Sequence, residues 1–223
     1  MDRRTGLVLA LDMDYETPAL ELVADVYTYV DAIKIGYVLI LSEGLSVMKA
    51  IKREFPQLPI IADLKIADAP HIARKMTLLA LDAGADVVSV CGVCGATVIQ
   101  ECLQLTEYRK KNLLVFLEFT QLDGLIGPNQ ANQIALMAKE RSAWGILAPG
   151  TKPHRIKELR SLVGQNLVIV SCGIGAQGIE PGTALKAGAD FEIVGRHICT
   201  ALDPKVAAAN ISNSLSAIIK GEA

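Results

Sequence analysis

Charged side chains of alternating sign make one segment the most informative part of this 223-residue sequence. The segment reads Asp63-Leu-Lys65-Ile-Ala-Asp68 and follows apolar residues typical of a buried strand. Residues two apart on a strand share a face, so we expect Asp63 and Lys65 to point the same way. Charges fixed before a reaction need no reorganisation during it, which suits a catalytic site. A structural ion pair at the end of the strand is the alternative interpretation.

Two further charged residues accompany neighbouring apolar runs. Asp12 ends the first expected strand, and Lys34 lies inside the second, in Ala-Ile-Lys-Ile-Gly. A lysine within an apolar run either extends to solvent or meets a carboxylate. Alternating charges keep lysines protonated and carboxylates ionised. We therefore expect one charged network that includes Asp12 and Lys34, although a structural role for Lys34 alone stays open.

Glycines and an arginine follow the last two expected strands. The sequence Gly173-Ile-Gly175-Ala-Gln177-Gly178 precedes the final strand, which ends at Gly195-Arg196. Glycine backbone N–H groups can approach a phosphate closely, and the arginine fork can bind it through two hydrogen bonds. The glycine pattern also matches a dinucleotide fingerprint. That motif normally opens the first βαβ unit and needs an acidic residue after the next strand. We therefore favour a phosphate site.

Cysteine and histidine residues give no metal or redox pattern. Cys91-Gly-Val-Cys94 has no second CxxC and no thioredoxin-like context, so small residues at a strand exit explain it better. The three histidines are scattered without ligand spacing, although His71 lies close enough to the charged segment to touch a ligand. We expect neither a metal nor an organic cofactor.

Short runs typical of strands alternate with longer segments of helical periodicity along the chain. The expected strands cover residues 7–11, 32–36, 59–65, 86–90, 113–119, 145–148, 167–171 and 191–194. The expected helices cover residues 20–27, 47–55, 72–80, 98–108, 131–141, 155–163, 183–187 and 206–219. This alternation predicts an α/β protein with a parallel sheet covered by helices.

Eight such units in about 220 residues fit a compact (β/α)8 TIM barrel. No linker or block of like charge divides the chain, so we expect a single domain over residues 1–223. An open doubly wound sheet is the main alternative. In a barrel, the loops after strands seven and eight form the usual phosphate site, where the glycines and Arg196 stand.

Composition excludes several classes of protein. Hydrophobic residues make up 51% of the chain, so it is not disordered. Lys and Arg number 22 against 24 Asp and Glu, which disfavours a general nucleic-acid-binding surface. The odd number of cysteines, five, suggests free thiols in a reducing cytosol. No apolar run approaches a membrane span and no leader is evident, so we expect a cytoplasmic protein without membrane or nucleic-acid partners.

Several segments together resemble a known family over nearly the whole chain. The chain is similar to the archaeal-type orotidine 5′-monophosphate (OMP) decarboxylases. The segments that carry the resemblance are Leu9–Asp12, Asp31–Tyr37, Ile61–Asp68, Ala148–Pro153, Gly173–Gly178 and Ile193–Arg196. Lys34 and the glycine-rich loop are the most discriminating, since related sugar-phosphate enzymes share the Asp-x-Lys-x-x-Asp pattern. Those relatives usually carry an acidic residue at position 34, which helps to hold magnesium.

The resemblance implies a role for each candidate residue. The implied catalytic residues are Lys34, Asp63, Lys65 and Asp68, with Asp68 reaching across the interface of a homodimer. The implied substrate-binding residues are Asp12, Lys34, Thr120, Gly173, Gly175, Gln177, Gly195 and Arg196. Asp12 and Lys34 are expected on the ribose hydroxyls, and Gln177, Gly195 and Arg196 on the phosphate, with the loop after strand seven closing over it.

Three departures from the family pattern fall where the base would bind. His71-Ile72 stands where an Asn-Thr-like pair is usual, and Cys172 stands where proline is usual. Residues 120–124 replace a Ser-x-Pro-Gly turn, and Thr120 can supply the missing serine hydroxyl to the pyrimidine. These changes leave the charged network and the phosphate site intact.

The resemblance implies cofactor-free decarboxylation of OMP to uridine 5′-monophosphate (UMP) in pyrimidine biosynthesis. One alternative is a magnesium-dependent sugar-phosphate enzyme of the 3-keto-gulonate 6-phosphate decarboxylase or hexulose-phosphate synthase type. Lys34 argues against that alternative. A second alternative is a catalytically silent barrel that binds a nucleotide or phosphosugar, which the intact Asp63, Lys65 and Asp68 set disfavours.

Overall fold

Eight parallel strands form a closed barrel in the computed structural model, which describes residues 1, 3–121, 123–175 and 178–222. The strands pair in chain order, and the first also pairs with the last. They are β1 (Leu7–Ala10), β2 (Ala32–Ile35), β3 (Ile60–Ile66), β4 (Val87–Cys91), β5 (Asn112–Phe116), β6 (Gly145–Pro149), β7 (Val168–Ile174) and β8 (Phe191–Val194). The predicted (β/α)8 fold is confirmed, and the open sheet is excluded.

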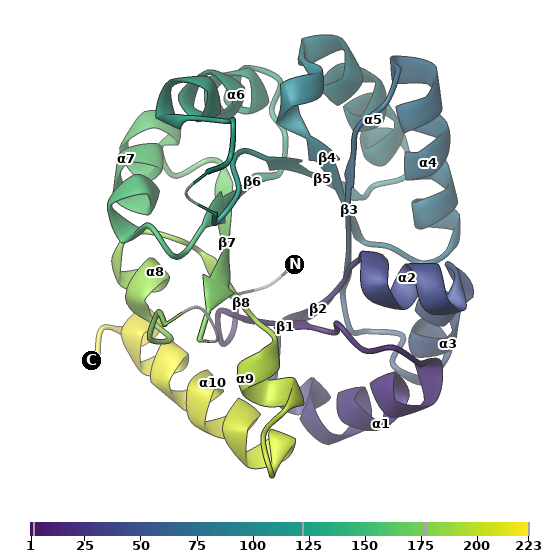
Figure 1. Ribbon diagram of the computed structural model, residues 1–223, viewed down its shortest axis with the longest axis vertical. Coiled ribbons are helices and arrows are strands. Elements are labelled where there is room, and N and C mark those ends of the chain that lie inside the picture. Colours follow the sequence, from purple (N-terminus) through teal and green to yellow (C-terminus); the bar gives the residue numbers. More distant parts are fainter. Residues whose placement is uncertain (2, 122, 176–177, 223) are drawn as a thin grey trace.

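Helices surround the ring of strands (Figure 1). The α-helices are α1 (Glu16–Val26), α2 (Tyr37–Glu43), α3 (Ser46–Glu54), α4 (Pro70–Asp82), α5 (Ala96–Tyr108), α6 (Pro128–Glu140), α7 (Pro153–Val163), α8 (Thr183–Lys186), α9 (Arg196–Cys199) and α10 (Pro204–Lys220). Two short 3-10 helices are η1 (Tyr27–Tyr29) and η2 (Gly92–Cys94). Among the described residues, no helix has the length and apolar character needed to cross a membrane.

Each strand is buried on both faces, which explains its nearly continuous apolar sequence. In β4, Val87 and Cys91 belong to the cluster inside the barrel, whereas Val88 and Val90 join the larger cluster between barrel and helices. The inner cluster also contains Phe116 and Phe191, and Met1 packs against it. The barrel is therefore a packed core, and charged side chains find room only at its ends.

Several expected strand boundaries differ from the observed ones. Strand β8 begins and ends as expected, but β5 stops at Phe116 and β7 continues to Ile174. Helices α2 and α9 were not predicted. Each has one buried apolar side chain, Leu39 in α2 and Ile198 in α9, so neither carries the apolar stripe that reveals a helix in sequence.

Candidate active site

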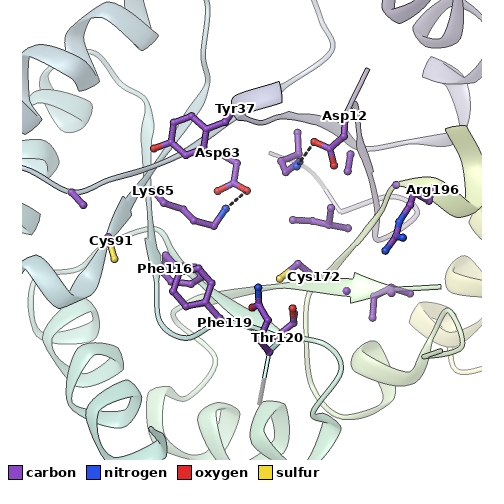
Figure 2. A pocket seen from close by; sticks show the side chains of 18 residues that line it. Asp12, Tyr37, Asp63, Lys65, Cys91, Phe116, Phe119, Thr120, Cys172 and Arg196 are labelled. Carbon is purple, nitrogen blue, oxygen red and sulfur yellow. Dashed lines mark hydrogen bonds and ion pairs between the residues drawn. The ribbon is translucent and has the colours of Figure 1, made fainter. Parts of the chain in front are cut away.

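A cavity of about 630 Å³ opens where the strands end at their carboxyl side, the face at which TIM barrels place their sites. Figure 2 shows the side chains that line it. They are Ala10, Asp12, Lys34, Tyr37, Asp63, Lys65, Ala67, Cys91, Phe116, Phe119, Thr120, Gln121, Cys172, Gly173, Ile174, Ile193, Gly195 and Arg196. The charged residues predicted from the ends of strands one to three thus meet in one place, except Asp68.

Lys34 and Asp12 form the first ion pair of the cavity. Nζ of Lys34 lies 2.9 Å from Oδ1 of Asp12, and the lysine side chain is 11% exposed against 49% for the aspartate. Gly36 makes room for this pair, because an added Cβ would lie 3.1 Å from Nζ and 3.3 Å from Oδ1. The lysine is therefore held inside the mouth of the barrel and does not extend to solvent.

Lys65 and Asp63 form the second and more buried pair. Nζ of Lys65 lies 2.7 Å from Oδ2 of Asp63, whose side chain is 7% exposed. The ammonium also lies 5.6 Å from the centre of the Phe116 ring, within the range of a cation–π contact. Both side chains line the cavity as expected, although the backbone of Lys65 leaves the regular strand, with φ of 40°.

Arg196, one of the residues predicted to bind a phosphate, lies across the cavity from Lys65 (Figure 2). Arg196 is exposed, begins the short helix α9 and follows Gly195 at the end of β8. Gly175 has φ of 77°, and an added Cβ would lie 2.8 Å from Nδ1 of His197, so only glycine fits. Gly173 lines the cavity. The predicted residue Gln177 lies outside the described residues.

Aromatic and small residues form the floor on the side of β5 and β7. The rings of Phe116 and Phe119 meet edge to face, with centroids 4.7 Å apart. Thr120, the proposed replacement for a serine, lies beside them in Figure 2. Cys172 faces them from β7. This combination of a flat apolar surface and a hydroxyl can accommodate a planar heterocycle.

Two thiols near the cavity, those of Cys172 and Cys199, stay protonated at neutral pH. Burial, with a smaller contribution from the Asp63 charge, raises the pKa of Cys172 to about 11. Burial, with the Asp12 charge, likewise raises the pKa of Cys199 to about 11. Burial also raises the pKa of Cys94. Since the thiolate is the nucleophile and metal ligand, this arrangement does not suit a redox or metal-binding role.

Two residues singled out from the sequence lie away from the cavity. Asp68 is exposed in the loop after β3, and its Oδ1 accepts a hydrogen bond from the backbone N–H of Ala69. His71 is exposed in the first turn of α4 and lines a separate groove with Glu101 of α5. Within this one chain, neither side chain joins the charged network.

Tyr37 is a cavity residue that the sequence analysis did not select. Its hydroxyl donates a hydrogen bond to the backbone carbonyl of Leu64. Burial, followed by the nearby Asp63 charge, raises the pKa of the phenol. Tyr37 starts helix α2, which was itself not predicted. Its position directly after the strand that carries Lys34 could have indicated that Tyr37 lies at the cavity.

The donor set does not suit a divalent cation. Among the described residues, no group of three His, Cys, Asp or Glu side chains is arranged to hold a metal. The carboxylates of Asp12 and Asp63 each face an ammonium at 2.9 and 2.7 Å, so a positive charge already occupies their coordinating side. Magnesium needs several oxygen ligands in an octahedron, and these pairs do not supply them.

Comparison with known proteins agrees with the sequence resemblance. The model of the orotidine 5′-phosphate decarboxylase / HUMPS family matches residues 5–211. The chain is 40% identical to an orotidine 5′-phosphate decarboxylase of Methanosarcina acetivorans, over 100% of both chains. It is 37% identical to one of Pyrococcus furiosus, over 92% of this chain and 95% of the relative.

Solved structures show the same likeness in three dimensions. The orotidine 5′-monophosphate decarboxylase of Methanocaldococcus jannaschii, complexed with the inhibitor BMP, superposes with a TM-score of 0.87 at 33% identity, over 94% of this chain and 97% of that one. The enzyme of Pyrococcus horikoshii gives 0.86 at 34% identity, over 94% and 98%. The chain therefore belongs to the orotidine 5′-phosphate decarboxylase / HUMPS family.

Proposed function

We propose that this protein is a carboxy-lyase that converts OMP to UMP in pyrimidine biosynthesis, without a cofactor. The observation that carries the proposal is the arrangement of two ion pairs and Arg196 around one cavity (Figure 2). Asp63–Lys65 lies on one side, and Arg196 lies on the other, beside Asp12 of the Asp12–Lys34 pair. A nucleotide has the matching layout, with a reacting base at one end and a phosphate at the other. Full-length relatives named as orotidine 5′-phosphate decarboxylases support this reading.

Arg196 and the glycines after β7 and β8 would bind the phosphate. The guanidinium can donate two parallel hydrogen bonds to phosphate oxygens, and the backbone at Gly173 and Gly195, which both line the cavity, can approach the phosphate closely. Gly175 would belong to the same phosphate site. Gln177 would also bind the phosphate. Asp12 and Lys34 would hold the ribose hydroxyls, and Thr120 would hold the pyrimidine. Binding energy from the phosphate, remote from the reacting bond, can then lower the barrier.

Lys65 would supply the proton of the reaction. As the bond between C6 of the pyrimidine and its carboxylate breaks, carbon dioxide leaves and the electron pair stays on C6. The ammonium of Lys65 stabilises this carbanion and transfers a proton to it, giving UMP. Asp63 lies against Lys65 and, in this proposal, against the departing carboxylate. Both charges are in place before the substrate arrives, so little reorganisation accompanies the reaction.

We further propose a cytoplasmic homodimer in which Asp68 completes the partner's site. Asp68 is exposed and lies outside the cavity of its own chain. Exposed apolar side chains follow the neighbouring strands β2 and β4, and they are Tyr37, Val38 and Leu41 of α2 and Val93 of η2. A second copy would cover them reciprocally. All five cysteines are free, which suits a reducing compartment.

Lys34 argues against the alternative hypothesis of a magnesium-dependent sugar-phosphate decarboxylase or synthase. Its ammonium occupies the position beside Asp12 that a metal would need. The hypothesis of a catalytically silent barrel requires that the cavity only bind a ligand. The buried Asp63–Lys65 pair disfavours it, because burying charge has a cost that binding a neutral base does not require.

Ultraviolet absorbance of OMP tests the proposal directly. The wild-type chain should consume OMP and yield UMP at the same rate with and without a metal chelator. Lys65→Ala should reduce the rate to background while the chain stays folded, whereas Lys49→Ala, at an exposed position on α3, should have no effect. Loss of activity with chelator would favour the magnesium enzyme. Binding of UMP without turnover would favour the silent barrel.

A further inference from the structure

We propose that Ser89 of β4 is a positioning residue that holds the Asp63–Lys65 pair in its reactive arrangement. The inference rests on the proposed function, because it assigns the serine a part in that reaction. Ser89 is fully buried and does not line the cavity. In sequence it is a single hydroxyl within the apolar strand Val-Val-Ser-Val-Cys.

Strands β3 and β4 lose their regular register beside this serine. Ala62 pairs with Val88 and Ile66 pairs with Val90. Three residues of β3, positions 63 to 65, therefore stand opposite Ser89 alone. Extra residues of this kind form a bulge, which commonly re-aims a side chain next to an active site. Here the bulged segment is the one that carries Asp63 and Lys65.

The Ser89 hydroxyl takes the place of the missing ladder contacts. Its Oγ accepts a hydrogen bond from the backbone N–H of Lys65 at 2.8 Å and donates one to Oδ1 of Asp63 at 2.9 Å. The other carboxylate oxygen of Asp63 faces Nζ of Lys65 at 2.7 Å. One hydroxyl thus ties the backbone of the lysine to the carboxylate that orients its ammonium.

These two hydrogen bonds of Ser89 matter because the backbone of Lys65 is strained. Its φ of 40° lies in the left-handed region, which a residue with a Cβ adopts only when its surroundings hold it there. Without the hydroxyl, the N–H of Lys65 loses its acceptor and Oδ1 of Asp63 loses a donor. The segment can then relax towards an ordinary strand and carry the ammonium away from the reacting carbon.

Kinetics of two substitutions at position 89 and one matched control test the assignment. Ser89→Ala should lower kcat for OMP by about 10- to 100-fold, the effect of one lost buried hydrogen bond to a charged group. KM should change little, because the phosphate site is untouched. Ser89→Thr keeps the hydroxyl and should recover most of the loss. Ser171→Ala removes an equally buried hydroxyl that bonds the Phe191 carbonyl of β8, and should leave kcat unchanged.

Equal losses of kcat in Ser89→Ala and Ser171→Ala, or an unchanged kcat in Ser89→Ala, would overturn the positioning role. A crystal structure of Ser89→Ala gives a readout that does not depend on activity. We expect Lys65 to leave the left-handed region and its contact with Asp63 to lengthen. An unaltered Lys65 overturns the inference even if the wild-type chain decarboxylates OMP. A relaxed Lys65 in a chain inactive on OMP would instead support the tie and count against the proposed function.

Discussion

At the scale of single residues, the two ion pairs of the cavity are not equivalent. Asp63 is almost fully buried, whereas half of the Asp12 side chain is exposed. Removing one partner of a buried pair costs about 3–5 kcal/mol, whereas an exposed pair contributes about 0–1 kcal/mol. The Asp63 carboxylate therefore depends more on its lysine than the Asp12 carboxylate does, and this suits a role at the reacting bond. Lys34 is itself only 11% exposed, but its partner Asp12 is closer to solvent than Asp63, which suits contacts with hydroxyl groups.

Arg196 should contribute to binding through the phosphate alone. Replacing it by alanine removes a charge-assisted contact worth about 1.5–3 kcal/mol, so the affinity for UMP should fall by about 10- to 150-fold. The affinity for uridine, which has no phosphate, should stay unchanged. Calorimetry with both ligands measures the difference, and Arg53→Ala on the exposed face of α3 is the control. Equal loss of affinity for UMP and uridine would place the phosphate elsewhere.

At the scale of elements, apolar periodicity predicted the strands and most of the helices. It did not predict the places where the backbone departs from regular structure. The ends of β8 were predicted because the short segment Phe191–Val194, rich in residues that favour strands, lies between Asp190 and Gly195, which do not. The bulge in β3 was not visible, since a period of two puts positions 63 and 65 on one face with or without it. Asp12, Lys34, Asp63 and Lys65 could be expected in one cavity because parallel strands end at the same rim. Ser89, a single hydroxyl in the middle of an apolar strand, gave no such pattern.

Asp86 ties several elements together at the opposite end of the barrel. Its carboxylate accepts hydrogen bonds from the backbone N–H of Ile60 at 3.0 Å and from Nζ of Lys111 at 2.6 Å, and it lies 2.6 Å from Nζ of Lys52. Burial alone would raise its pKa, but the hydrogen bonds from Lys111 and Lys52 outweigh burial and lower it. The ionised form is therefore favoured by folding.

Asp86→Asn should destabilise the fold in a pH-dependent way. A carboxyl with a lowered pKa stabilises the folded state above its unfolded pKa, and this stabilisation is lost as pH falls through the folded value. The variant should lose about 1–3 kcal/mol of unfolding free energy at pH 7, and the difference from wild type should shrink below about pH 4. Urea unfolding across pH measures it, with Asp25→Asn on the exposed face of α1 as control. A difference independent of pH would contradict the charge-based account.

At the scale of the whole molecule, the cavity is incomplete in one chain if the reaction needs Asp68. Asp63 and Lys65 belong to β3 itself, but Asp68 lies beyond its end, in an exposed loop. A carboxylate there can reach the mouth of a neighbouring barrel and help to keep the partner's lysine protonated. A two-fold interface would place the same loop of each chain against the other. Catalysis and assembly would then depend on each other.

Mixing two inactive variants separates action across the interface from action within a chain. Asp68→Ala and Lys65→Ala should each be inactive alone. After subunit exchange at equal concentrations, half of the dimers are mixed, and each mixed dimer has one site with an intact Lys65 and the partner's intact Asp68. About a quarter of wild-type activity should therefore return. If Asp68 acts within its own chain, neither site of a mixed dimer is complete, and no activity returns although mass analysis confirms exchange. A chain that sediments as a monomer at assay concentration would equally exclude the composite site.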